Sequence, residues 1–138
     1  MSEVPYDPEL YFYGEEIAMS ARLWTSGFNI YAPNRPLLFH LYKTEHTDQE
    51  HAATHWGDHS NWHHYNLRAL KRVHRLLGSL NNAPESIRCF NAQPYELQPF
   101  GLGKKRKLSM YQQWAGVDFK TAEISQAARH AEFKMSPL

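Results

Sequence analysis

Two carboxylates and two histidines lie in the N-terminal part of the chain, among mostly apolar residues. Glu15 and Glu16 open a helix-patterned run, His40 lies inside the apolar run 37–43, and His46 follows. A carboxylate can accept a proton from a hydroxyl group, and an imidazole can bind Mn²⁺ or Zn²⁺. With the basic residues nearby, these groups suit a site that handles an activated, phosphate-bearing substrate.

The two glutamates are candidate catalytic residues, but they cannot both face one reacting atom. Neighbouring helix residues diverge by about 100°, which argues against the opposed acid–base pair of a glycosidase. Glu15 shares a helix face with Arg22 and is the better cleft candidate, whereas Glu16 lies beside Leu23. Gly14 has no side chain to obstruct a ligand. The alternative is that both acids only stabilise a helix N-terminus.

His40 is one of many histidines, and a metal-binding role for it competes with a core or rim position. Some of the histidines that follow it are spaced four residues apart, which would align their side chains on a helix. However, Gly57 interrupts this run, and the glutamate of the metalloprotease motif HExxH is absent. The chain has no CxxC pair, which excludes a structural zinc finger. We interpret most of the following histidines as solvated loop residues, with a zinc site as the alternative. They are His46, His51, His55, His59, His63 and His64.

Length and composition predict one domain, or part of a larger one. The 138 residues are 42% hydrophobic and 21% charged, which is enough apolar material for a core. A net charge of +1 gives no bulk attraction to nucleic acid or to a membrane surface. No signal peptide is visible, and no apolar run reaches the ~20 residues that span a bilayer. Cys89 is the only cysteine, and we expect it to be a small, buried hydrophobic residue. We therefore expect a soluble, cytoplasmic chain with no nucleic-acid or membrane partner.

Hydrophobic periodicity and glycine stops predict helices joined by short strands and loops. In the first helix, Ile17, Ala21 and Trp24 form one apolar face. Two glycines precede the basic stretch 104–107, which we interpret as a solvated loop because it lacks a Walker motif. The predicted elements are helices at 15–26, 62–77, 108–114 and 121–132, strand-like runs at 28–31 and 37–42, a long loop at 44–60, a turn-rich stretch at 81–99 and an extended link at 117–119.

The run GEEIAMSARLW, residues 14–24, resembles a segment of GT-A glycosyltransferases that act on polypeptides. It is most similar to the GlcNAc-transferase family that includes the cytoplasmic enzyme attaching GlcNAc to hydroxyproline. The same order follows here: Ala-Pro and a histidine strand, a Leu-Leu-Gly helix, Gly-Leu-Gly with a basic follow-on, and Gly-Val-Asp-Phe at 116–119. The resemblance covers about residues 6–120.

A more distant resemblance is to the polypeptide GalNAc-transferases. There a histidine at the spacing of Glu15 to His40 binds Mn²⁺ beside the diphosphate of the sugar nucleotide. Lys43 and His46 occupy the places of two residues that approach the nucleotide, whereas Asp48 replaces a tyrosine of that family. The resemblance thus implies that His40 is a metal ligand, and that Lys43 and His46 bind the nucleotide.

The resemblance implies an α/β fold, the C-terminal part of a GT-A-like glycosyltransferase. We expect residues 1–120 to form this region, without the N-terminal nucleotide-binding half, and 121–138 to form a C-terminal helix and tail. The chain contains no D-x-D or D-x-H, the motif with which these enzymes hold metal and nucleotide.

The implied reaction transfers GlcNAc from UDP-GlcNAc to a protein hydroxyl, with Mn²⁺ or another divalent metal. The implied partners are the sugar nucleotide, a protein or peptide acceptor, and a separate N-terminal half or partner chain. Two alternatives stay open: a truncated, non-catalytic remnant or interaction domain of the same fold, and a histidine-rich zinc-binding protein.

Overall fold

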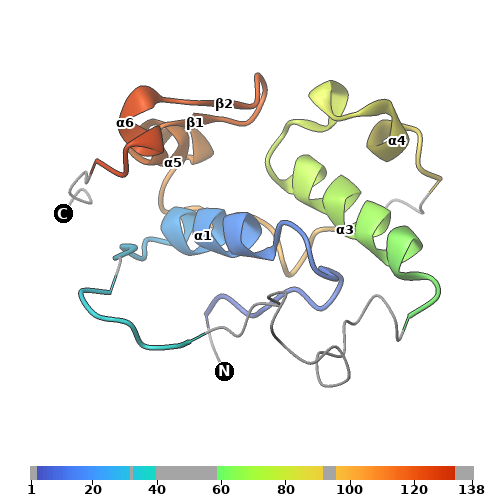
Figure 1. The fold of residues 1–138 in the computed structure, drawn as a ribbon, viewed down its shortest axis with the longest axis horizontal. Helices are drawn as coiled ribbons and strands as arrows, with labels where there is room; N and C mark the ends of the chain where they lie inside the picture. Colours follow the sequence, from blue (N-terminus) through green and yellow to red (C-terminus); the bar gives the residue numbers. More distant parts are fainter. Residues whose placement is uncertain (1–2, 32, 40–58, 92–95, 133–138) are drawn as a thin grey trace, which may run out of the picture.

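Helix α1 (Glu15–Thr25) lies between two other helices, α3 (Trp62–Leu76) and α5 (Leu108–Ala115), and contacts both (Figure 1). The computed structural model describes residues 3–31, 33–39, 59–91 and 96–132. These three helices confirm the helices predicted at the same places, to within a residue or two at each end. The remaining elements are η2 (Leu80–Asn82), α4 (Glu85–Arg88), β1 (Val117–Asp118), β2 (Glu123–Ile124) and α6 (Gln126–Arg129).

The core is built from small residues of α1 and an aromatic cluster beside them. Ala18, Ala21 and Trp24 are fully buried, so α1 approaches both neighbours closely. The Trp24 ring stacks on Trp114 with centroids 4.5 Å apart and meets Tyr111 edge-on. Burial raises the pKa of the Tyr111 hydroxyl. The prediction of a single apolar face on α1 is therefore incomplete, because α3 and α5 cover the helix on two sides.

The sheet has two strands, β1 and β2, which pair antiparallel and lie beside α5 and α6 (Figure 1). Helices combined with a two-stranded sheet confirm the predicted α/β class. The single helix predicted over 121–132 is wrong. Asp118 accepts hydrogen bonds from the N–H groups of Lys120 and Thr121, which makes a turn, and Ala122 and Ala131 have positive φ angles that a right-handed helix excludes.

The strand-like runs predicted at 28–31 and 37–42 do not form strands where the structure describes them, at 28–31 and 37–39. The backbone at Phe28 has other partners: its N–H donates to Leu23, and its carbonyl accepts from the Arg106 guanidinium. Leu37, Leu38 and Phe39 are exposed. The stretch predicted as turn-rich contains η2 and α4.

Two ion pairs join the N-terminal segment, residues 3–14, to α3. Arg72 donates to Asp7 over 2.7 Å, and each side chain is only 3% exposed. Arg68 pairs with Glu9 nearer the surface. Because a buried charge must be compensated, the Asp7–Arg72 pair holds the predicted irregular lead-in in one position.

Two further sequence predictions are decided by exposure and length. Cys89 is exposed, so the prediction of a buried cysteine is wrong. Among the residues that the structure describes, no helix is long and apolar enough to cross a membrane.

Asp7→Asn is expected to destabilise the protein much more than Glu9→Gln. The first change leaves Arg72 buried without its counter-charge and close to Arg22, which costs about 3–5 kcal/mol. The second breaks a partly exposed pair with Arg68, which is worth about 0–1 kcal/mol. Urea unfolding followed by tryptophan fluorescence measures both free energies. Equal losses in the two variants would contradict this role of the buried pair.

Candidate functional site

Glu15 is the first residue of α1, and its carboxylate is held by a tyrosine from the N-terminal segment. The Tyr6 hydroxyl donates a hydrogen bond to Oε2 of Glu15. This bond is the largest cause that raises the pKa of Tyr6 from 10.0 to about 12, followed by partial burial and by nearby carboxylates. Oε1 of Glu15 has no hydrogen-bond partner in the part of the chain that the structure describes. The carboxylate is thus oriented on one side and open on the other.

Three aromatic side chains of the N-terminal segment, which precedes α1, are partly exposed to solvent. Tyr6, Phe12 and Tyr13 are each 41–49% exposed, and the rings of Phe12 and Tyr13 meet edge-on with centroids 5.0 Å apart. Exposed rings of this kind offer faces on which a sugar or a peptide side chain can pack. Tyr6 could not be singled out from the sequence, because nothing in the local pattern of the lead-in places it beside Glu15.

A small pocket of about 260 Å³ lies between the N-terminal segment and α3. Tyr11 and Tyr65 form part of its wall with their rings 5.6 Å apart, and the Glu9–Arg68 pair lies at its edge. The pocket combines apolar ring surface with charged groups of both signs. The sequence carries no signal for it, because its walls come from segments more than fifty residues apart.

Glu16 and Gly14, the other members of the predicted acidic motif, have separate roles. Glu16 is exposed, in the first turn of α1, where negative charge is favourable. Gly14 has a positive φ of 88°, and a Cβ atom there would lie 2.8 Å from the Val73 side chain. Packing of α1 against α3 therefore requires this glycine.

The helical pattern predicted that Arg22 shares a surface with Glu15, and the structure contradicts this prediction. Arg22 is 2% exposed, and its Nε lies 3.4 Å from the carbonyl oxygen of Gly101. Its guanidinium and that of Arg72 both lie over the Phe100 ring, at 5.7 and 5.9 Å from the centroid. Burial lowers the pKa of Arg22, while the Asp7 carboxylate opposes this shift. Arg22 is therefore part of the interior and does not face a ligand beside Glu15.

The basic loop at 104–107 is anchored to the C-terminus of α1. The N–H groups of Lys105 and Arg106 donate to the Thr25 carbonyl, and the N–H of Gly103 donates to the Thr25 hydroxyl. The Arg106 guanidinium lies 4.7 Å from the centre of the Trp24 ring. Because these backbone donors already have partners, they are not available to a phosphate; Lys104, Lys105 and Lys107 remain exposed.

Three predicted site residues, His40, Lys43 and His46, lie outside the described residues. Among the later histidines, His63 stacks on Trp62 and His64 meets Phe90 edge-on. Across the described ranges, no three His, Cys, Asp or Glu side chains come together in a group that could hold a metal ion. The described residues alone therefore do not build a metal site.

A family model described as Glycosyltransferase (GlcNAc) matches residues 1–121. The chain belongs to this glycosyltransferase family. No curated protein and no solved structure matches the chain. The mixed α/β structure is consistent with a glycosyltransferase-like fold. Membership of the family also implies a sugar nucleotide and an acceptor as partners. The matched residues include α1 with Glu15, the N-terminal segment with Tyr6, and the pocket beside them.

The Tyr6 hydroxyl is expected to ionise near pH 12, and Glu15→Gln is expected to move its pKa back toward 10. The hydrogen bond favours the neutral phenol, so its stabilising effect is present below pH 10 and is lost as the pH rises toward 12. Ring-carbon NMR of labelled tyrosines measures the titration, with Tyr6→Phe identifying the signal.

Glu16→Gln is the matched control, because it removes the same charge from the next residue. Glu16 is the smallest of the causes that raise the Tyr6 pKa. This control variant is expected to leave the titration nearly unchanged. A Tyr6 midpoint near 10 in the unmodified protein would show that the Tyr6–Glu15 bond is not formed in solution.

Proposed function

We propose that this glycosyltransferase-family chain takes part in transferring GlcNAc from UDP-GlcNAc to a hydroxyl group of a protein, with Mn²⁺ or another divalent metal. The observation that carries the proposal is the family match over residues 1–121, which contains an oriented and accessible carboxylate, Glu15. The motif order described above supports the GT-A type, a hydroxyproline-like acceptor and a cytoplasmic location, all of which are part of the proposal.

Glu15 is proposed to position or activate the acceptor hydroxyl, or to contact the donor sugar. Tyr6 occupies Oε2, which leaves Oε1 to accept a hydrogen bond from a substrate hydroxyl. As the acceptor oxygen bonds to C1 of GlcNAc, its proton passes to the carboxylate, and the bond from C1 to the diphosphate breaks with its electrons leaving on UDP. The exposed rings of Phe12 and Tyr13 provide a surface for the acceptor or the sugar.

The donor side of the site is proposed from the resemblance. His40 would be a ligand of the metal, and Lys43 and His46 would offset the charge of the diphosphate. Since the chain has no D-x-D or D-x-H, the proposal requires aspartate ligands from a polypeptide segment outside these 138 residues. The same absence favours a second candidate, a non-catalytic interaction domain of the same family.

Glu15→Gln is expected to lower the rate of GlcNAc transfer by about 10²–10⁴-fold, the range for loss of a general base. The assay mixes the chain with UDP-GlcNAc, Mn²⁺, a polypeptide that supplies the aspartate ligands and a peptide that carries hydroxyl groups, and follows the peptide mass. Glu85→Gln, on the exposed short helix α4, is the control for loss of a negative charge and is expected to keep the rate.

Calorimetric titration with UDP and Mn²⁺ separates the two candidates. Tight UDP binding by this chain excludes the non-catalytic candidate. No UDP binding and no transfer, by the chain alone or with a polypeptide that supplies the aspartates, would overturn the proposed transfer. Equal rates of GlcNAc transfer in Glu15→Gln and Glu85→Gln would show that Glu15 has no catalytic role.

A further inference from the structure

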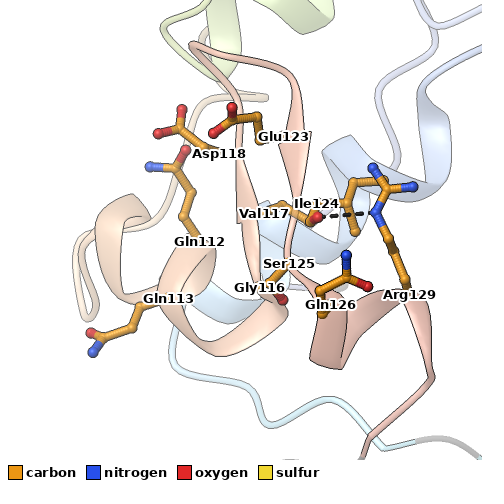
Figure 2. Close-up of a pocket in the computed structure, with 10 residues that line it drawn as sticks. All are labelled: Gln112, Gln113, Gly116, Val117, Asp118, Glu123, Ile124, Ser125, Gln126 and Arg129. Carbon is orange, nitrogen blue, oxygen red and sulfur yellow. Dashed lines mark hydrogen bonds between the residues drawn. The ribbon is translucent and has the colours of Figure 1, made fainter.

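A larger pocket, of about 680 Å³, lies away from Glu15, between α5, the β1–β2 hairpin and α6 (Figure 2). Its volume is within the range of roughly 300–1,000 Å³ that is usual for ligand sites. One wall, from α5 and β1, belongs to the residues that the family model matches, whereas β2 and α6 lie beyond residue 121. The pocket shares no lining residue with the smaller pocket or with the surroundings of Glu15, so it is a separate site.

Local hydrogen bonds hold the walls of this pocket in place. Gly116 has a φ of 69°, and a Cβ atom there would lie 2.3 Å from the Ser125 hydroxyl, so the two chain segments touch at this point. The Ser125 N–H donates to the Gly116 carbonyl over 2.8 Å. Across the pocket, the Gln112 side chain accepts from the N–H of Phe119, and Arg129 Nε donates to the Ile124 carbonyl. These contacts fix the walls of the pocket relative to one another.

The pocket carries opposite charges at its two ends. Asp118 and Glu123 are directly opposite each other in the β1–β2 pair, and Figure 2 shows both carboxylates at one end and Arg129 at the other. One oxygen of each carboxylate accepts local hydrogen bonds; the other has no partner among the described residues. Like charges placed opposite each other in a sheet are destabilising, so a cation between them would relieve a cost that is already present.

The chemistry of the lining excludes several ligand classes. None of the ten lining residues is aromatic, so a nucleobase or a sugar ring has no face on which to stack. Two carboxylates against one guanidinium disfavour a phosphate group. The two acids lack a third His, Cys, Asp or Glu partner among the described residues, which leaves a metal ion poorly coordinated. The side-chain amides of Gln112 and Gln126 instead offer both donors and acceptors, which suits a peptide backbone.

We propose that this pocket binds a basic segment of a polypeptide partner. A lysine or arginine side chain lies between Asp118 and Glu123, Arg129 contacts a carbonyl or carboxylate of the bound segment, and the glutamine amides bind its backbone. The site goes beyond the proposed transfer reaction and does not depend on it, because binding can be measured without any sugar nucleotide.

The test is an NMR titration of the isotope-labelled full chain with a short blocked alanine peptide that has one central lysine. Saturable shifts are expected at backbone amides of residues 112–129. Acetylation of the lysine is expected to weaken binding at least as much as loss of both carboxylates, because it removes the charge that they contact. Glu123→Gln is expected to weaken binding about 1.4-fold to fivefold, the range for an exposed ion pair, and the double variant with Asp118→Asn about twofold to thirtyfold.

Glu85→Gln is again the matched control, since it removes one negative charge on α4, at the far end of the structure from α6 (Figure 1). It is expected to leave peptide binding unchanged. No saturable shift, or equal binding of the acetylated peptide, would overturn the proposal, as would an equal loss in Glu85→Gln and Glu123→Gln. Peptide binding here without sugar transfer would leave this site standing while the proposed transfer fails.

Discussion

The buried ion pair between Asp7 and Arg72 is the contact on which the arrangement of the described structure depends. Each of the two side chains is only 3% exposed, so water cannot replace either charge as the partner of the other. The pair therefore fixes the N-terminal segment on α3, and with it Tyr6, the neighbour of Asp7. Arg72 also donates to the Glu96 carbonyl and lies over the Phe100 ring, so the same guanidinium organises the segment that follows 96.

That segment continues into the loop that caps α1. Gly103 packs so closely on the end of the helix that a Cβ atom would lie 2.3 Å from the backbone nitrogen of Ser26. The hydrogen bonds from this loop to Thr25 satisfy groups that a helix C-terminus leaves open. The glycine and basic residues, for which the sequence predicts a solvated loop, thus have a structural function. The side chains of Lys104, Lys105 and Lys107 are exposed and can still meet an anion.

These constraints place the two proposed sites on different parts of the fold. Glu15 is the first residue of a helix with buried faces, and Tyr6 reaches it from a segment fixed by the buried pair, so the carboxylate has a defined orientation. The charged pocket depends instead on the Gly116–Ser125 contact and on the register of two short strands. The proposed transfer to a protein needs both a reacting centre and a surface that holds the polypeptide, and the two proposed sites would divide these tasks.

The sequence by itself determined the three longest helices, their stops and the family. Periodic apolar residues and the glycines at 27, 78 and 116 are local signals, and the helices α1, α3 and α5 follow them. The motif order in residues 6–120 led to the glycosyltransferase family, which the match over 1–121 establishes. Glu15 was identified as a candidate from its place at a helix N-terminus.

Only the tertiary structure decided which residues surround Glu15 and which are buried. Tyr6 and Asp7 lie in a lead-in without periodicity, and their partners are distant in sequence, so no local pattern could reveal them. Arg22 was placed on the Glu15 side because helical spacing says which residues share a face but not what covers that face; here Phe100 and Gly101 cover it. The helix predicted at 121–132 failed for a related reason. Its alanines and glutamate favour a helix locally, but the turn closed by Asp118 and the pairing of β2 with β1 determine the backbone there.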